Sequence, residues 1–79
     1  MPEAARLKRL KIRSWRRGIR EMDLILGPWF DREGAGLSEA ELDHYEALLE
    51  ENDQALYAWV SGRETPPAEF TDLIARLRP

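Results

Sequence analysis

The residues best suited to chemistry form a cluster of positive charge around one glycine. Four arginines lie within five positions of Gly18, and a carboxylate, Glu21, follows three positions after it. The arginines are Arg13, Arg16, Arg17 and Arg20. A concentration of one charge sign usually marks a surface that meets a partner of the opposite charge. The cluster therefore predicts contact with an anionic partner, without identifying the anion.

The whole chain has the same charge polarity on a larger scale. Residues 1–20 carry eight basic side chains and one acid, Glu3, whereas the other 59 residues carry four basic and fourteen acidic side chains. The two parts therefore have net charges of +7 and -10 within a total of -3. This division predicts one basic face for a partner and an acidic remainder that keeps the protein in solution.

Gly18 is better placed at a corner between two helices than inside one helix. An unbroken helix would set Arg16 and Arg20 one turn apart, where like charges repel, and a glycine inside it would cost about 1 kcal/mol relative to alanine. A corner removes both penalties and puts Glu21 in the first turn of the next helix, where a carboxylate is favoured. We therefore predict an exposed corner that carries Arg16, Arg17, Arg20 and Glu21 together.

For three sets of residues in and near this cluster, two interpretations remain open. Arg17 and Glu21 could instead form an ordinary surface ion pair, worth about 0 to 1 kcal/mol. Trp15 could support the corner or stack on a partner. Trp29 and Phe30 could belong to the core or form an exposed aromatic anchor.

Helical periodicity around the cluster predicts two helices that meet near Gly18. Leu7 and Leu10 would pack on one side of the first helix. The second would bury a stripe of apolar residues and end at Gly27-Pro28, because both residues interrupt helices. Residues 31–36 would then be a flexible loop. The apolar stripe consists of Ile19, Met22, Ile25 and Leu26.

The rest of the chain shows three further helix signals. Ser38 and Glu41 have the spacing of a capping box, and Asp53 is a candidate N-cap for a short helix that Gly62 closes. The last stripe has spacings of three and four residues, as on one helix face, and comprises Phe70, Leu73, Ile74 and Leu77. Without any alternating strand pattern, the sequence predicts an all-α fold: a compact bundle of about five short helices in a single domain, residues 1–79.

Composition excludes several classes of protein. There is no cysteine for a disulfide or thiolate metal site. No apolar run approaches the roughly 20 residues of a membrane span, and no signal peptide is evident, so we expect a cytoplasmic protein. The single histidine, His44, is expected to be a solvated or half-buried helix residue. Without a nucleophile triad, phosphate loop or ligand cluster, the sequence predicts no catalytic residue, no metal and no enzyme activity.

At this point two blocks resemble a known family. The stretch "RRGIREMDLILGPWF" is similar to the signature of the succinate dehydrogenase assembly factor 2 family, small flavinylation factors of bacteria and mitochondria. The matching positions are Arg17, Gly18, Glu21, Met22, Asp23, Pro28, Trp29 and Phe30. Farther on, "LSEAELDHYEALLEENDQALYAWVSG" resembles the second block of that family. The two blocks together cover roughly residues 8–77.

The resemblance implies a five-helix fold and a chaperone-like role. Members bind the flavoprotein subunit of succinate dehydrogenase, and often that of fumarate reductase, and promote covalent attachment of FAD to a histidine of that subunit. The chain itself would bind no cofactor stably, would act on the FAD of its partner and would be a monomer alone. The implied contact centres on Arg17, Gly18 and Glu21. With the neighbouring cluster, the predicted contact residues are Trp15, Arg16, Arg17, Gly18, Arg20, Glu21, Met22, Asp23, Trp29 and Phe30.

The competing interpretation is a small nucleic-acid-binding regulator that lays its basic N-terminal helix along phosphates. No helix-turn-helix pattern, RNA-binding aromatic block or zinc spacing accompanies that helix. The acidic remainder would also repel a polyanion. We therefore expect a protein partner and no nucleic acid.

Overall fold

Five α-helices and two short 3-10 helices make up the part of the chain that the computed structural model describes, residues 4–78. In chain order they are α1 (Ala4–Trp15), α2 (Arg20–Glu33), η1 (Gly34–Gly36), α3 (Glu39–Leu49), α4 (Asp53–Val60), η2 (Ala68–Phe70) and α5 (Thr71–Leu77). No strand occurs within these residues. The predicted all-α fold with about five short helices is confirmed.

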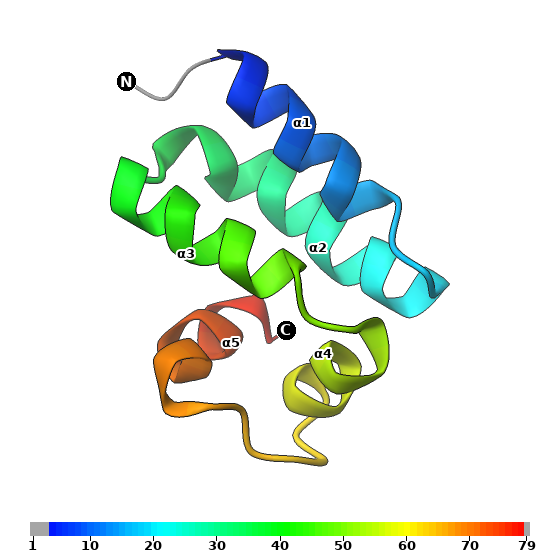
Figure 1. Cartoon of the computed structure of the whole chain (residues 1–79). Helices are drawn as coiled ribbons and strands as arrows, with labels where there is room; N and C mark the ends of the chain where they lie inside the picture. The colour runs from blue at the N-terminus through cyan, green and yellow to red at the C-terminus, as the bar shows by residue number, and fades with distance from the viewer. Residues whose placement is uncertain (1–3, 79) are drawn as a thin grey trace.

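The helices are arranged in two groups around one core. Helices α1, α2 and α3 lie side by side, and the shorter α4 and α5 lie across one side of them (Figure 1). The apolar stripes predicted from the sequence face inward, so that Leu10, Met22 and Leu26 from the first two helices are at most 1% exposed. The last stripe is also buried, although its first residue, Phe70, belongs to η2.

Tyr45 of α3 lies at the centre of the core. Its ring stacks on Trp29 and Phe30 of α2, with centroid distances of 5.4 and 5.1 Å. Its hydroxyl shares a 2.6 Å hydrogen bond with the buried Ser14 of α1. Burial raises the pKa of Tyr45 to about 12, because the phenolate would lose its hydration. Tyr45 therefore joins α1, α2 and α3.

Helix α2 is longer than the sequence signals indicated. The prediction that Gly27-Pro28 ends it is wrong: the helix continues to Glu33, and η1 follows directly where a flexible loop over residues 31–36 was expected. Proline inside a helix costs about 3 kcal/mol. Continuing the helix brings Trp29 and Phe30 onto Tyr45, and burying two such rings is worth about 8 to 12 kcal/mol. The packing therefore outweighs the local helix-stop signal.

Helix ends follow the other local signals closely. Ser38 and Glu41 form both hydrogen bonds of the capping box, and the Ser38 N–H holds the pKa of Glu41 below its usual value. Gly62 has a left-handed φ of 83°, as expected after α4. The N-cap of α4 is Asn52, not Asp53: the Asn52 side chain accepts from the N–H of Ala55 at 3.0 Å. Asp53, the first helical residue, is therefore free for another contact.

Candidate partner-binding corner

The chain turns between α1 and α2 at residues 16–19, so the predicted helix break near Gly18 is confirmed. The turn does not use a left-handed glycine, because Gly62 is the one residue with positive φ in the range 4–78. Ile19, the N-cap of α2, supplies no side-chain hydrogen bond. The corner therefore lacks the local capping that fixes the start of α3 or α4.

The Arg17 side chain stabilises the corner instead. It reaches across to the link between α3 and α4, residues 50–52, and to the helix ends beside it. Its Nε donates to Asp53 Oδ1 at 2.7 Å, and its two terminal nitrogens donate to the carbonyls of Leu49 and Glu51 at 2.9 and 3.0 Å. Leu49 is the last residue of α3, whose carbonyl end favours a cation. The Arg17 and Asp53 side chains are only 10% and 16% exposed. The expectation of an exposed Arg17 is therefore wrong, and its salt bridge is with Asp53, not with Glu21.

Two carboxylates complete this arrangement by holding the backbone of the corner. Asp53 Oδ2 accepts from the N–H of Gly18 at 2.5 Å, while its other oxygen accepts from Arg17. Asp23, from the first turn of α2, accepts from the N–H of Arg17 at 2.6 Å. We call Arg17, Gly18, Asp23 and Asp53 the corner clamp. It fixes side chain and backbone of the corner at the same time.

Gly18 is required by this clamp for a steric reason. A Cβ added at residue 18 would lie 2.7 Å from Asp53 Oδ2, closer than real Cβ contacts. Asp53 cannot move away freely, because Arg17 holds its other oxygen. The structure therefore gives a reason for this glycine within the chain itself.

The outward side of the corner carries five of the predicted contact residues. Arg16, Gly18, Arg20 and Glu21 are exposed, and the Trp15 side chain is 37% exposed. Trp15 also supports the corner: its indole lies against Gly27, and its Nε1 donates to Asp31 at 3.2 Å. A Cβ at Gly27 would lie 2.3 Å from the indole, so only glycine fits beneath it. These residues form a fixed surface on one side of the α1–α2 pair.

Three predicted contact residues lie in the core. Met22, Trp29 and Phe30 are 0%, 4% and 4% exposed, so their side chains cannot reach a partner that docks on this conformation. Of the two interpretations of Trp29 and Phe30, the structure supports the core. Trp29 and Phe30 support the corner only indirectly, by stacking on Tyr45 of α3.

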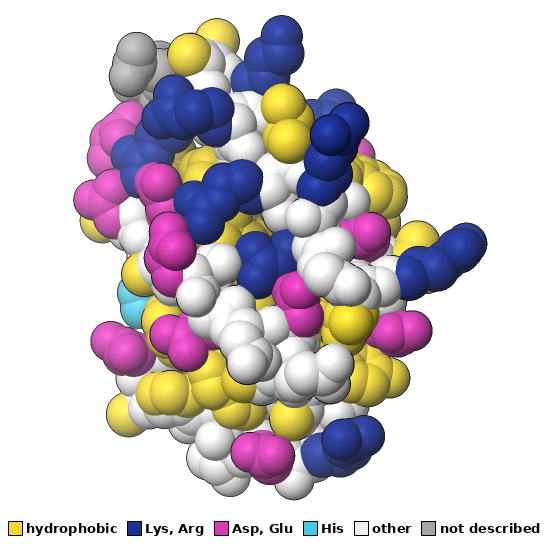
Figure 2. All heavy atoms as spheres, turned by 45° about the vertical axis from the view of Figure 1, so that its right-hand side comes forward, with side chains coloured by type: hydrophobic (Ala, Val, Ile, Leu, Met, Phe, Trp, Pro, Cys, Tyr) yellow, Lys and Arg dark blue, Asp and Glu magenta, His cyan; other side chains and the backbone are white. Residues whose placement is uncertain are grey.

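Half of the basic side chains in the first twenty residues are engaged within the chain. Arg6 contacts Glu39, Asp43 and Glu46 of α3, and the hydrogen bond to Asp43 raises its pKa. Further salt bridges join Lys11 to Asp31, Arg13 to Glu46 and Glu50, and Arg17 to Asp53. Lys8, Arg9, Arg16 and Arg20 have no carboxylate partner within residues 4–78. Figure 2 draws one face of the molecule, where Lys and Arg side chains gather over the upper half and acidic side chains lie beside several of them.

The sequence did not indicate Asp53 as a functional residue. Its only visible signal was its place at the start of α4, which suggested a cap. Nothing in the sequence links it to Gly18, which lies 35 positions earlier. Only the packing of the two corners against each other brings these residues together.

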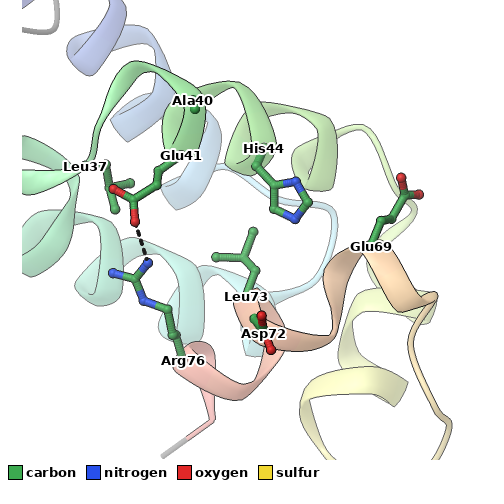
Figure 3. Close-up of a pocket in the computed structure, with 8 residues that line it drawn as sticks. All are labelled: Leu37, Ala40, Glu41, His44, Glu69, Asp72, Leu73 and Arg76. Carbon is green, nitrogen blue, oxygen red and sulfur yellow. Dashed lines mark hydrogen bonds and ion pairs between the residues drawn. The ribbon is translucent and has the colours of Figure 1, made fainter.

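A shallow groove lies on another side of the molecule, between α3 and α5. It encloses about 400 Å³ and is lined by His44, by Leu37 and Leu73, and by an acidic rim (Figure 3). His44 is half-buried, as expected, and its ring packs against Phe70 at 5.2 Å. No three potential metal ligands come together in residues 4–78. None of the helices formed by these residues is long and apolar enough to cross a membrane.

Taken together, these observations define a small helical protein with a charged, exposed corner whose backbone is held by the corner clamp. Its family follows from the sequence comparison: the family described as flavinator of succinate dehydrogenase matches residues 8–79, and the chain belongs to it. The resemblance found in the two sequence blocks is thereby confirmed.

Similar proteins carry related names. The FAD assembly factor SdhE of Legionella pneumophila (strain Paris) is 38% identical over 63 residues, covering 80% of each chain. That of Xylella fastidiosa (strain 9a5c) is 37% identical over 79 residues, covering 99% of this chain and 80% of the relative. The mitochondrial succinate dehydrogenase assembly factor 2 of Debaryomyces hansenii is 43% identical over 53 residues, covering 67% and 37%. No solved structure matches the chain.

Proposed function

We propose that this chain is an assembly factor that binds the flavoprotein subunit of succinate dehydrogenase and promotes covalent attachment of FAD to a histidine of that subunit. The flavoprotein subunit of fumarate reductase is a second client in this proposal. The FAD belongs to the client, and the factor contributes a binding surface. The setting is the cytoplasm, as expected for a bacterial-type chain.

The observation that carries this proposal is the corner clamp. Arg17 and Asp53 fix the corner from within, while Arg16, Gly18, Arg20 and Glu21 stay exposed. A surface held in one conformation before binding loses little conformational entropy when a partner docks. The Gly18 position also lets a partner's backbone come close, since it carries no side chain. The family membership makes the flavoprotein subunit the natural partner for this surface.

The charges of the corner suit the proposed reaction. When FAD is attached through its 8α-methyl group, that group loses a proton and negative charge develops on the flavin ring. Cations fixed near such a charge stabilise it, because they need no reorganisation during the reaction. Arg16 and Arg20 are the exposed cations of the corner. A docked factor would also hold the client in a reactive geometry, which lowers the entropy cost of attachment.

The test is a flavinylation assay with purified components. The client subunit, produced without the factor, is incubated with FAD and the factor, and covalent flavin is measured by in-gel fluorescence. Arg20→Gln and Glu21→Gln should each lower the initial rate about tenfold or more, as expected for loss of a charge-assisted contact. Arg63→Gln is the matched control, because Arg63 is exposed after α4 and has no carboxylate partner within residues 4–78.

Thermal unfolding distinguishes variants that lose the contact with the client from variants that no longer fold. Arg20 and Glu21 are exposed and form no salt bridge in the described chain, so each change should alter the free energy of unfolding by less than about 0.5 kcal/mol. Full covalent incorporation with both corner variants would contradict the proposed contact. A wild-type chain that neither binds the client nor speeds flavinylation would contradict the proposed function itself.

A further inference from the structure

A stripe of three exposed residues and the half-buried Pro28 runs along the outer side of α2, beginning at the corner. Arg20, Leu24, Pro28 and Arg32 follow one another at intervals of four, so they share one face of the helix. We call these four residues the α2 stripe. Leu24 is 56% exposed, more than the other exposed large hydrophobic residues of the described chain, Ile12 at 49% and Trp15 at 37%.

The stripe borders a hollow between α2 and α5. The hollow has a volume of about 170 Å³. Leu24, Ile25, Pro28 and Arg32 line it from α2, and Arg76, Leu77 and Arg78 line it from the other side. The hollow is small and open, so it suits one inserted side chain better than a small-molecule ligand. Such a side chain would meet apolar atoms of Leu24, Pro28 and Leu77, and the side chains of Arg32, Arg76 and Arg78 supply the polar part of the lining.

The backbone of the stripe also offers a hydrogen-bond acceptor. Pro28 lies inside α2 and has no N–H, so it cannot donate to the carbonyl of Leu24 as a residue at that position normally would. A helix that continues through proline therefore leaves one acceptor without its usual intrahelical donor. That acceptor belongs to the most exposed apolar residue of the stripe.

Positive charge flanks the apolar centre at both ends. Neither Arg20 nor Arg32 has a carboxylate partner within residues 4–78. Three acids of α2 are engaged elsewhere, Asp23 with the N–H of Arg17, Asp31 with Lys11 and Trp15, and Glu33 with Arg76, whereas Glu21 is exposed beside Arg20. Arg20 and Arg32 are twelve residues apart, which is about 18 Å along a helix. The stripe therefore presents the sequence cation, apolar centre, cation.

We propose that the α2 stripe is a second docking surface, which takes a segment of the client flavoprotein carrying an apolar side chain between two carboxylates. The apolar side chain enters the hollow beside Leu24, and the carboxylates pair with Arg20 and Arg32. The inference rests on the proposed function, because Arg20 belongs to both the corner and the stripe. A partner already docked at the corner would lie directly against the start of α2. The stripe then adds affinity and sets the orientation of the factor on its client.

The experiment measures the dissociation constant of the complete factor for the purified flavoprotein subunit. Leu24→Ser should weaken binding about 10- to 100-fold, as expected for a leucine that becomes buried on binding. Ile12→Ser is the matched control: Ile12 is a similarly exposed helical residue on α1, and its change should alter binding less than about twofold. Arg32→Glu should also weaken binding and make it less sensitive to salt, whereas Arg63→Glu should not.

The flavinylation rate at saturating factor distinguishes the stripe from the corner. Leu24→Ser and Arg32→Glu should approach the wild-type rate when the factor is in excess, because they affect docking alone. Equal binding by wild type and Leu24→Ser would overturn the stripe while leaving the proposed function intact. Equal weakening by Ile12→Ser and Leu24→Ser would also overturn it, as would a wild-type homodimer that Leu24→Ser dissociates. A wild-type chain that does not bind the subunit would instead refute the proposed function.

Discussion

The two interhelical corners of this protein lie against each other but are ordered in different ways. The α3–α4 link is fixed locally: Asn52 caps α4, and the N–H groups of Glu50 and Glu51 return to carbonyls of α3. The α1–α2 corner has no side-chain cap at Ile19; Asp23 of α2 holds the N–H of Arg17, and Asp53 of α4 holds the Arg17 side chain and the N–H of Gly18. The helix start at the α3–α4 link is therefore capped by its own sequence, whereas the α1–α2 corner needs a side chain of α4 in addition to its local contact with Asp23.

This difference explains how an exposed surface can be rigid. A corner that capped itself would use its own polar side chains, and these would then be unavailable to a partner. Here the fixing groups, Arg17 and Asp53, point inward, and Arg16, Arg20 and Glu21 remain exposed. The dependent corner is also the candidate contact. Substitutions of Asp53 should therefore affect the corner without replacing any of its exposed residues.

The strongest test of the comparison removes Asp53. Asp53→Ala leaves the mostly buried Arg17 without its carboxylate and frees the N–H of Gly18, so we expect a loss of about 3 kcal/mol in the free energy of unfolding. Urea unfolding measures it. In the double variant with Arg17→Ala, the two losses should not add, because each removes the same interaction. Additive losses would show that the clamp is not one unit.

A second test concerns the other tie between α1 and α3, at Tyr45 and Ser14. The pKa of buried Tyr45 is raised to about 12, so the folded state favours the neutral phenol. The contribution of Tyr45 to the free energy of unfolding is fully present below the unfolded pKa of about 10. As the pH rises towards 12, this contribution falls by about 2 kcal/mol. The free energy of unfolding, measured from pH 9 to 12, should show this decline in the wild type. Tyr45→Phe should flatten it, and an equal slope in both proteins would refute the assignment.

Adding one methyl group at Gly18 tests the steric part of the clamp. Gly18→Ala should cost about 1.5 kcal/mol, because its Cβ would collide with Asp53 Oδ2. The backbone itself allows alanine, since φ at this position is not positive. In an Asp53→Ala background the cost should therefore vanish. A cost that persists there would place the cause outside the clamp.

The smallest effect on the free energy of unfolding is expected at the α3–α4 link. Asn52→Ala removes the N-cap of α4 and should cost about 1 kcal/mol. Because Asn52 does not contact Gly18, this change should leave the flavinylation rate unaltered, whereas Asp53→Ala should reduce it. Urea unfolding and the flavinylation assay give the two readouts. Equal rates for both variants would show that corner geometry does not govern function.

The sequence predicted features whose determinants lie within a few residues. The capping box at Ser38 and Glu41, the left-handed Gly62 and the apolar stripe of α5 depend on neighbours in the chain, and all were correct. The predicted end of α2 at Gly27-Pro28 failed, because burial of Trp29 and Phe30 against Tyr45 outweighs the local stop. The N-cap of α4 was misplaced by one residue, to Asp53.

For the candidate site, the sequence located the helix break, the cluster of cations and the family. It could not separate an exposed arginine from a buried one, since Arg16 and Arg17 are adjacent and of the same type. Their roles diverge only because Arg17 faces the carbonyl end of α3 and Asp53. The burial of Met22, Trp29 and Phe30 likewise depends on which side of α2 meets α3.

By itself, therefore, the sequence determined the all-α class, most helix ends and the presence of a charged turn at Gly18, because these depend on local hydrogen bonds and on the period of apolar residues. The tertiary structure alone decided which charges face inward and which remain for a partner. The physical reason is that Asp53 and Gly18, 35 positions apart, meet only when the two corners pack together. Long-range packing thus assigns the role of each arginine in this chain.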